Sequence, residues 1–303
     1  MEATSHGKII LIGEHSVVYN YPAIAMPFYK GIVHVTLREN DVNAIKSSVY
    51  AGDLVASPQS ILPIRTLIES LQKALNLNPY LYDITGTLPI GSGLGSSAAI
   101  ASAIVKACFQ VNNVTLDRHS HYNWTQFSET LAHTNPSGID ALCVTNDNGW
   151  FFTKDKIEPL TIDLDAYLLI GNTGFKVPTK DSVNHVKHLI ESTPSHQADI
   201  KALGQLTLQS KDAIINQNHR ALAKAMNQAM IHLKNLGLST QTIDALNESA
   251  LKNGALSSKL TGGGMGGCVI ALCENHHTLK QVQSVWEDAF NIDTWSMTLK
   301  GDE

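Results

Sequence analysis

The stretch Pro89–Ala99, PIGSGLGSSAA, restricts the possible folds of this chain more than any other. Its three glycines and three serines lie between residues 82–88, which alternate as a half-buried strand does, and residues 98–110, which are rich in Ala and Ile. Glycines let the backbone turn sharply and approach a ligand closely, and a helix start offers unpaired N–H groups at the positive end of its dipole. The pattern predicts a strand, a phosphate-binding loop and a helix. An ordinary connector with Ser97 as the N-cap is the alternative.

Length and composition indicate an α/β (α+β) protein of two domains. The chain has 303 residues, of which 43% are hydrophobic and 16% charged, and this is a globular composition with ample material for a core. The character of the sequence changes near Lys154–Pro159, where a charged turn precedes strands expected at 160–164 and 167–170. We therefore expect domains at 1–158 and 159–303, with the active site in a cleft between them.

Charge and hydropathy exclude several classes of partner. The net charge of −5 argues against a nucleic-acid partner, because nucleic-acid-binding domains are normally basic. No apolar stretch approaches the roughly 18 residues of a membrane span, so no membrane is expected. The four cysteines form no CxxC pair and are expected as buried thiols of a cytoplasmic protein.

The N-terminal segment places polar residues at the end of an apolar strand. Residues 8–12, KIILI, predict a buried strand that ends at Gly13, and Glu14 and His15 follow directly. With Lys8 they form a titratable trio at a strand edge, as in a substrate site. A polar turn that caps a neighbouring element fits the same residues.

The segment from Glu129 to Asp140 also carries two carboxylates. Glu129 is expected on a helix that stops before Pro136, since the residue before proline disfavours helical geometry. Asp140 then precedes the apolar run 141–144, at the edge of a core, where a carboxylate needs a partner. This segment alone leaves Asp140 open as a helix cap or as a catalytic group.

The second half predicts helices near 181–192, 197–216, 219–236, 239–252 and 278–290, a strand at 269–273 and a last strand with alternating Trp295, Met297 and Leu299. Gly262–Gly267 satisfies GxGxxG, but a strand rather than a helix follows it, so it is no dinucleotide fingerprint. The first glycine-rich loop is no Walker A motif, because Gly-Lys-Ser/Thr does not end it.

Two other chemistries correspond to parts of the sequence. His119, His121 and His133 could suggest zinc, but no spaced ligand set completes a tetrahedron. The residues around Ser97 approximate the nucleophile elbow of a serine hydrolase, which would also need a later Asp and His.

Three segments together resemble the motifs of the GHMP kinases: residues 8–19, the Pro89–Ala99 loop and residues 259–268, in the family's order and across nearly the whole chain. Within the family, Gly-Glu-His followed by Ser-Val-Val-Tyr is similar to the members that act on mevalonate and unlike those that act on galactose. Asn20, Ile100 and Thr134 depart from the family's pattern.

The resemblance implies ATP-dependent phosphorylation of the primary alcohol of mevalonate to 5-phosphomevalonate, with ATP and Mg²⁺ as cofactors. It implies Asp140 as the base and Lys8 as its neighbouring cation, and Ser97 and Glu129 as Mg²⁺ ligands. The implied phosphate-binding residues are Pro89, Gly91, Ser92, Gly93, Leu94, Gly95, Ser96 and Ser97. The implied substrate residues are Glu14, His15, Thr179, Thr261 and Gly263.

Other functions remain open at this stage. Phosphomevalonate, homoserine and galactose kinases share the phosphate loop and differ in the substrate pocket. A non-catalytic sugar-binding regulator on the same fold is opposed by the presence of Lys8, Glu129 and Asp140 together. The expected partners are ATP and the small-molecule substrate, and the protein is expected as a monomer or a homodimer.

Overall fold

The computed structural model describes residues 1–132 and 136–301, so His133 of the zinc interpretation and Thr134 lie outside the described residues. The chain forms two compact units, each assembled from separate segments. The first unit comprises residues 1–8, 27–90 and 95–147, and the second comprises 9–26, 91–94 and 148–303. The chain passes between the units several times. A single domain boundary between residues 158 and 159 therefore stays a prediction.

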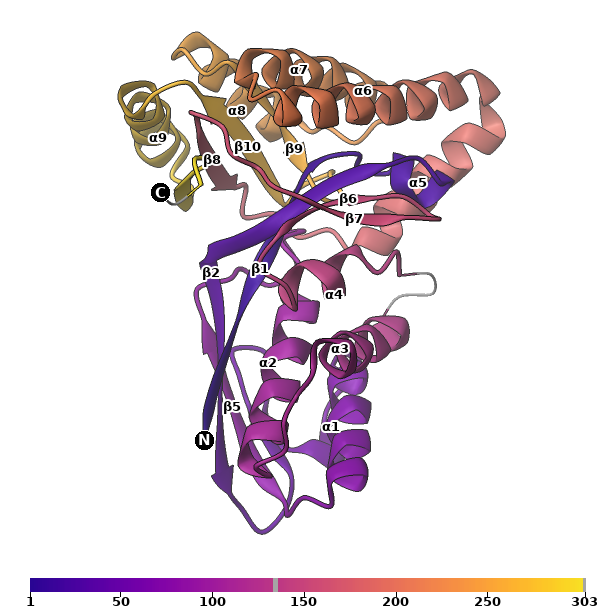
Figure 1. Ribbon diagram of the computed structural model, residues 1–303, viewed down its shortest axis with the longest axis vertical. Coiled ribbons are helices and arrows are strands. Elements are labelled where there is room, and N and C mark those ends of the chain that lie inside the picture. The colour runs from indigo at the N-terminus through magenta and orange to yellow at the C-terminus, as the bar shows by residue number, and fades with distance from the viewer. Residues whose placement is uncertain (133–135, 302–303) are drawn as a thin grey trace. The chain divides into compact units, whose positions relative to one another are not determined.

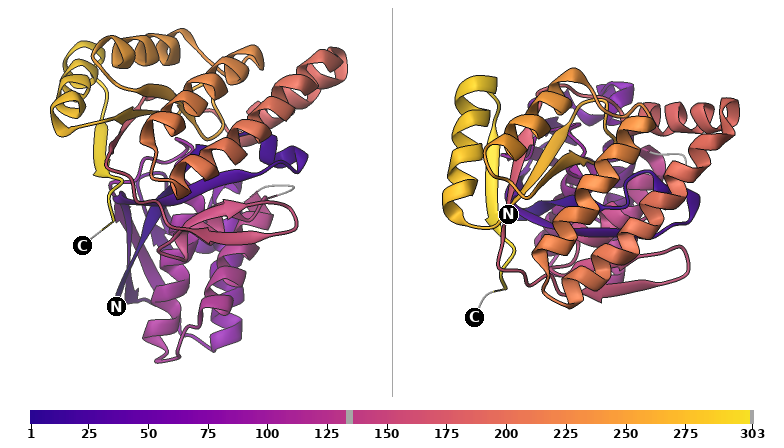
Figure 2. Two further views of the ribbon diagram at one scale, coloured as in Figure 1. Left: turned by 45° about the horizontal axis from the view of Figure 1, so that its top comes forward. Right: turned by 90° about the horizontal axis from the view of Figure 1, so that it is seen from above.

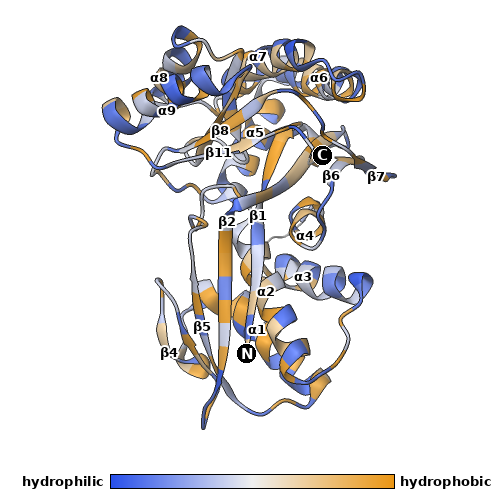
Figure 3. Cartoon of the chain, turned by 60° about the vertical axis from the view of Figure 1, so that its left-hand side comes forward, coloured by the Kyte–Doolittle hydropathy of each residue, from blue (hydrophilic) through white to orange (hydrophobic). Residues whose placement is uncertain are grey.

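The first unit is built on an antiparallel pair of long strands. Strand β2 (Ala23–Glu39) pairs with β5 (Tyr80–Gly86), in register from Val33 opposite Gly86 to Glu39 opposite Tyr80. Beyond β5 lie β3 (Ala44–Lys46) and β4 (Ala51–Asp53), while β1 (Glu2–Ile12) also pairs with β2. Val33, Val35 and Leu37 are buried, as their alternation predicts, and Figure 3 shows the change of hydropathy along β2.

Four helices complete the first unit: α1 (Leu62–Leu75), α2 (Ser96–Val111), α3 (Arg118–Ala132) and α4 (Ile139–Val144). The first three pack against one another, and α4 packs on α2 and α3 (Figure 1). Helix α1 buries Leu67, Ile68 and Leu71, which recur at the spacing of one face of an amphipathic helix. Helix α2 is buried along most of its length, because its many alanines let neighbouring elements approach closely.

The second unit contains a four-stranded antiparallel sheet in the order β11 (Thr294–Thr298), β8 (Tyr167–Asn172), β10 (Cys268–Cys273) and β9 (Ser257–Thr261). Strand β10 follows the glycine-rich stretch 262–267, as predicted. Strand β9 was not predicted, since residues 259–261 had been assigned to that stretch.

A further pairing in the second unit corrects one predicted strand. The first residues of β2 pair with β6 (Gly149–Phe152), and β6 pairs with β7 (Ile157–Leu160). The strand expected at 160–164 is therefore wrong, because the strand covers Ile157–Leu160 and includes part of the expected charged turn. Pro159 lies inside β7, opposite Trp150. Proline is tolerated there because β7 is the last strand of its sheet and has one neighbour.

Five helices belong to the second unit: α5 (Thr179–Ser192), α6 (Gln197–Ile215), α7 (His219–Asn235), α8 (Gln241–Lys252) and α9 (His276–Phe290). All five agree with the predicted ranges to within two residues at either end. Helices α6 and α7 run side by side (Figure 2), and α7 and α8 pack against β9. The fully buried Trp286 of α9 donates to the Leu246 carbonyl of α8 at 3.2 Å.

Short 3-10 helices occupy Ser16–Tyr19 (η1), Leu54–Ala56 (η2), Gln59–Ile61 (η3) and Pro194–His196 (η4). Asn20 ends η1 in the left-handed conformation, with φ 66°. Asparagine tolerates this conformation better than most residues, so Asn20 suits the end of this turn. All four cysteines are buried free thiols, as predicted. No helix in the described part of the chain is both long and apolar enough to cross a membrane.

Candidate active site

Lys8 and Asp140 form an ion pair inside the first unit. The Nζ atom of Lys8, near the end of β1, lies 3.1 Å from Oδ1 of Asp140, and the two side chains are 4% and 33% exposed. Asp140 lies in the first turn of α4, whereas the N-cap of that helix is Gly138. The cap interpretation of Asp140 is therefore wrong. The buried ammonium group therefore faces a carboxylate that a reactant can still reach.

Ser97 and Glu129 form a second pair in the same unit. The Ser97 hydroxyl of α2 donates to Oε1 of Glu129 on α3 at 2.7 Å, and Gly95 rather than Ser97 is the N-cap of α2. Burial, and next the negative charge of Asp140, raise the pKa of Glu129 to about 7, against the opposing effects of Ser97 and Lys8. We call these four side chains the carboxylate cluster. They come from four elements: β1, α2, α3 and α4.

The donor chemistry of Ser97 and Glu129 fits Mg²⁺. Hydroxyl and carboxylate oxygens are hard ligands, and Mg²⁺ is usually bound by one or two carboxylates together with phosphate oxygens and water. The raised pKa of Glu129 reflects a buried carboxylate next to a second acidic group, which is an environment that a divalent cation would relieve. Residues 1–132 and 136–301 contain no group of three or more His, Cys, Asp or Glu that could hold a metal by themselves.

Within the described residues, neither the serine-hydrolase nor the zinc interpretation has the arrangement of side chains that it requires. Ser97 donates to a carboxylate, whereas a serine nucleophile needs a neighbouring base such as histidine. Nε2 of His121 lies 2.8 Å from the Ser102 hydroxyl, inside the core of the first unit.

Gly95 explains how Lys8 reaches the cluster. The residue has φ 73°, and a Cβ atom there would lie 2.8 Å from Cγ of Lys8. The helix start therefore needs glycine both for its backbone conformation and for the space that the lysine side chain occupies.

In the second unit, residues from the two glycine-rich motifs lie backbone to backbone. A Cβ atom on Gly262 would lie 3.0 Å from the carbonyl oxygen of Gly93, and one on Gly267 would lie 2.7 Å from that of Ser92. Both positions have positive φ. Contact of this kind leaves no room for side chains and positions backbone amides from two distant parts of the sequence together.

The predicted substrate residues of the second unit surround this contact. Nε2 of the buried His15 donates to the Gly263 carbonyl at 2.8 Å, and burial lowers the pKa of His15 to about 4, so the imidazole is neutral. The Thr261 hydroxyl donates to the Ile10 carbonyl at 2.8 Å. Thr179 begins α5 and lies beside Gly263, where an added Cβ would be 3.6 Å from its Oγ1.

Lys259 has a structural role that the sequence pattern alone does not indicate. It is fully buried on β9, pairs with the equally buried Glu14, and donates to the Leu260 carbonyl at 2.7 Å. Glu14 is thus held inside the protein and supports the turn that carries His15. The available signal was a lysine directly before the Leu-Thr-Gly of the third motif, next to apolar residues.

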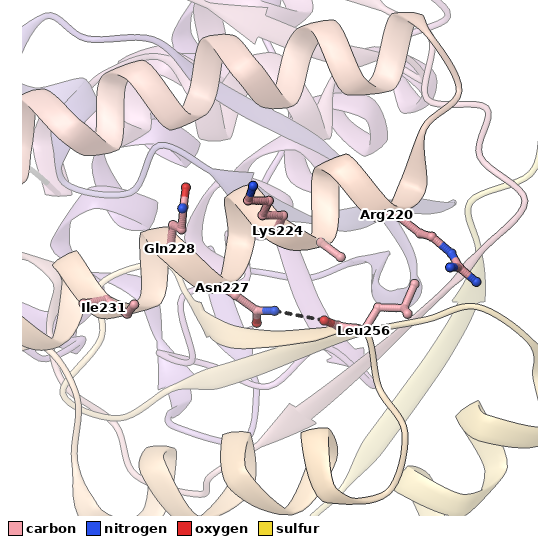
Figure 4. Close-up of a pocket in the computed structure, with 7 residues that line it drawn as sticks. Arg220, Lys224, Asn227, Gln228, Ile231 and Leu256 are labelled. Atoms are coloured by element: carbon pink, nitrogen blue, oxygen red, sulfur yellow. Dashed lines mark hydrogen bonds between the residues drawn. The ribbon is translucent and has the colours of Figure 1, made fainter.

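A surface hollow of the second unit lies away from all of these residues. A pocket of about 460 Å³ along α7 is lined by residues including Arg220, Lys224 and Ile231, and Asn227 beside it donates to the Leu256 carbonyl (Figure 4). None of the residues predicted for catalysis or binding lines it.

Comparisons with known proteins agree with the fold and the motifs. Residues 63–146 match the family described as GHMP kinases N terminal domain, and residues 210–292 match GHMP kinases C terminal. A mevalonate kinase from Pyrococcus furiosus is 30% identical over 298 residues, which cover 90% of this chain and 89% of that relative. These matches define the class of protein: an ATP-dependent kinase. The chain belongs to the GHMP kinase family.

Solved structures add to this comparison. The crystal structure of mevalonate kinase from methicillin-resistant Staphylococcus aureus MRSA252 is 31% identical with a TM-score of 0.79, and 99% of each chain is covered. The Streptococcus pneumoniae phosphomevalonate kinase in complex with phosphomevalonate and AMPPNP reaches a TM-score of 0.82 at 18% identity, covering 98% of this chain and 99% of that one. The fold is therefore shared by kinases of different substrates.

Proposed function

We propose that this enzyme transfers the γ-phosphoryl group of ATP to the primary alcohol of mevalonate, giving 5-phosphomevalonate and ADP. The observation that carries the proposal is the Lys8–Asp140 pair at 3.1 Å, at the positions where the family resemblance predicts the cation and the base. The identity of about 30% to mevalonate kinases over most of the chain supports the substrate.

In the proposed reaction the alcohol oxygen attacks the γ-phosphorus, the bond from phosphorus to the ADP oxygen breaks, and the alcohol proton passes to Asp140. An ordinary aspartate is a weak base, with a pKa near ~3.9, but it needs to accept the proton only as the new P–O bond forms. Lys8 holds the Asp140 carboxylate through their ion pair and offsets negative charge at the reacting oxygen.

The proposed nucleotide site uses the backbone of Gly91–Gly95 and the start of α2, where amides and the helix dipole attract phosphate. Ser97 and Glu129 would hold Mg²⁺, which when bound neutralises phosphate charge. His15, Thr179, Thr261 and Gly263 would shape the mevalonate pocket, with Glu14 holding the His15 turn through Lys259. We expect the enzyme to work in the cytoplasm, as a monomer or homodimer.

A coupled assay of ADP release over a panel of alcohols tests this proposal. The panel contains mevalonate, phosphomevalonate, homoserine and galactose, each with ATP and Mg²⁺. We expect turnover with mevalonate to exceed that with the other three by orders of magnitude, and Asp140→Asn to abolish most of it. Preference for another member of the panel would replace mevalonate as the substrate, and turnover unaffected by Asp140→Asn would remove the proposed base.

A further inference from the structure

The core of the first unit contains a buried polar network that the proposed mechanism does not use. The Ser5 hydroxyl donates to the Ser102 hydroxyl at 3.0 Å, and the Ser102 hydroxyl lies 2.8 Å from Nε2 of His121. Both serine hydroxyls also lie within 3.3–3.4 Å of the Val144 carbonyl oxygen. All three polar side chains are less than 7% exposed. We call these groups the serine–histidine network.

The network joins the same four elements that carry the carboxylate cluster. Ser5 lies on β1, three residues before Lys8, and Val144 lies on α4, four residues after Asp140. Ser102 lies on α2, five residues after Ser97, and His121 lies on α3 with Glu129 two turns further along.

Each of the two pairs in the carboxylate cluster joins two elements. A contact of the serine–histidine network joins the same two elements. Lys8–Asp140 joins β1 to α4, and the Ser5 hydroxyl with the Val144 carbonyl joins them again. Ser97–Glu129 joins α2 to α3, and Ser102 with His121 joins them again. The bond from Ser5 to Ser102 then links one pairing to the other.

The two serine hydroxyls and Nε2 of His121 all have hydrogen-bond partners within the network. Burial, and next the charge of Lys106, lower the pKa of His121 to about 4, so the ring is neutral and Nε2 can donate or accept. If Nε2 donates to Ser102, the Ser102 hydroxyl donates to the Val144 carbonyl. If Ser102 donates to Nε2, the one Ser5 hydrogen is shared between the Ser102 hydroxyl and the Val144 carbonyl. A satisfied buried network holds its elements in one arrangement, while a partly satisfied one is costly.

We propose that Ser102, together with Ser5 and His121, is a positioning residue for the phosphoryl transfer: it holds Lys8 against Asp140 and Ser97 against Glu129. This inference rests on the proposed function for the identity of the reaction, but not for the coupling between the two sets of residues. Displacement of catalytic groups by about 1 Å can cost up to ~100-fold in rate, so small shifts of β1 or α4 matter.

The test compares Ser102→Ala with Ser210→Ala. Ser210 is also fully buried, but its hydroxyl bonds only to the Leu206 carbonyl of its own helix α6 among the bonds described, so its loss breaks no link between elements. With the alcohol that the wild type uses best, we expect Ser102→Ala to lower kcat about tenfold with KM for the alcohol within about twofold. Ser210→Ala should lose stability but keep kcat within about twofold.

A denaturation cycle tests the coupling without any assay of activity. Ser102→Ala and Asp140→Asn should be non-additive in the equilibrium constant of unfolding by about fivefold, as expected for residues of one network. Ser210→Ala and Asp140→Asn should be additive. If Ser102→Ala does not fold, Ser5→Ala replaces it in both experiments, because it removes the contacts of Ser5 with Ser102 and Val144 and leaves Ser102 with His121.

The outcomes separate the two proposals. A wild type that phosphorylates no alcohol of the panel would contradict the proposed function, and the denaturation cycle alone would then decide the network's role. Additive stabilities, or a kcat of Ser102→Ala as high as that of Ser210→Ala in an active enzyme, would overturn the positioning role.

Discussion

At the scale of single residues, the candidate site depends on charges placed where water is scarce. Lys8 is buried beside Asp140, Glu129 is buried beside Ser97, and Lys259 is buried with Glu14. An ion pair of this kind adds little stability beyond a well-packed apolar pair, but loss of one partner leaves an uncompensated charge. Such arrangements fix the protonation state and position of a group, which a phosphoryl-transfer enzyme requires.

The first prediction concerns Lys8 and Asp140 as one functional unit. Lys8→Met and Asp140→Asn should each lower single-turnover rates strongly, and the double variant should lose little beyond the worse single variant, because both act on the same reacting oxygen. Thermal melts run beside the rates give the fraction of folded enzyme. Fully additive losses of rate, or losses of melting temperature alone, would contradict a catalytic pair.

The second prediction separates the metal ligand from the base. Glu129→Gln should raise the Mg²⁺ concentration at half-maximal activity several-fold, because one charged oxygen ligand is lost. Asp140→Asn should lower turnover and leave nucleotide affinity within a few fold. Mg²⁺ titrations of both variants measure the difference, and equal shifts of Mg²⁺ dependence would remove this division of roles.

At the scale of elements, the backbone conformation at the start of α2 also affects the position of the Lys8 side chain. The loop before the helix turns through glycines of positive φ, and the last of them, Gly95, leaves space for the Lys8 side chain from β1. The conformation of the proposed phosphate loop and the position of Lys8 therefore both depend on one residue without a side chain.

The third prediction uses a pair of glycine substitutions. Gly95→Ala places a Cβ atom 2.8 Å from Cγ of Lys8, whereas Gly174→Ala has a similar φ of 78° with nothing within 4 Å. Both should lose about 1 kcal/mol of stability through backbone strain. Only Gly95→Ala should also lower turnover, by about tenfold or more, as Lys8 is displaced. Equal turnover of the two variants in steady-state assays would show that the contact between position 95 and Lys8 does not affect turnover.

At the scale of the whole molecule, each unit holds a histidine that folding keeps neutral. Burial lowers the pKa of His121 in the first unit and of His15 in the second to about 4, from ordinary values near 6.5. The unfolded chain therefore binds more protons than the folded one between these pH values. Stability from these residues is complete above about pH 6.5 and is lost as the pH falls toward 4.

The fourth prediction follows from this loss of stability at low pH. The free energy of unfolding should fall by about 3 kcal/mol per buried histidine between pH 6.5 and 4, at 1.36 kcal/mol per unit of pKa shift. Chemical denaturation at several pH values measures this slope. His121→Gln, which has no proton to gain, should have a shallower slope over the same range, and an unchanged slope would mean that His121 is not a source of it.

Local sequence by itself determined most helices, most strands and the glycine-rich loop, because periodicity, proline and glycine act over a few residues. It missed β9 and misplaced β7, because pairing with β10 and β6 decided those strands. It named Lys8, Ser97, Glu129 and Asp140, but left Asp140 between cap and base. Only the tertiary structure joined the four, since packing of β1, α2, α3 and α4 brings together charges that lie up to 132 positions apart in the sequence.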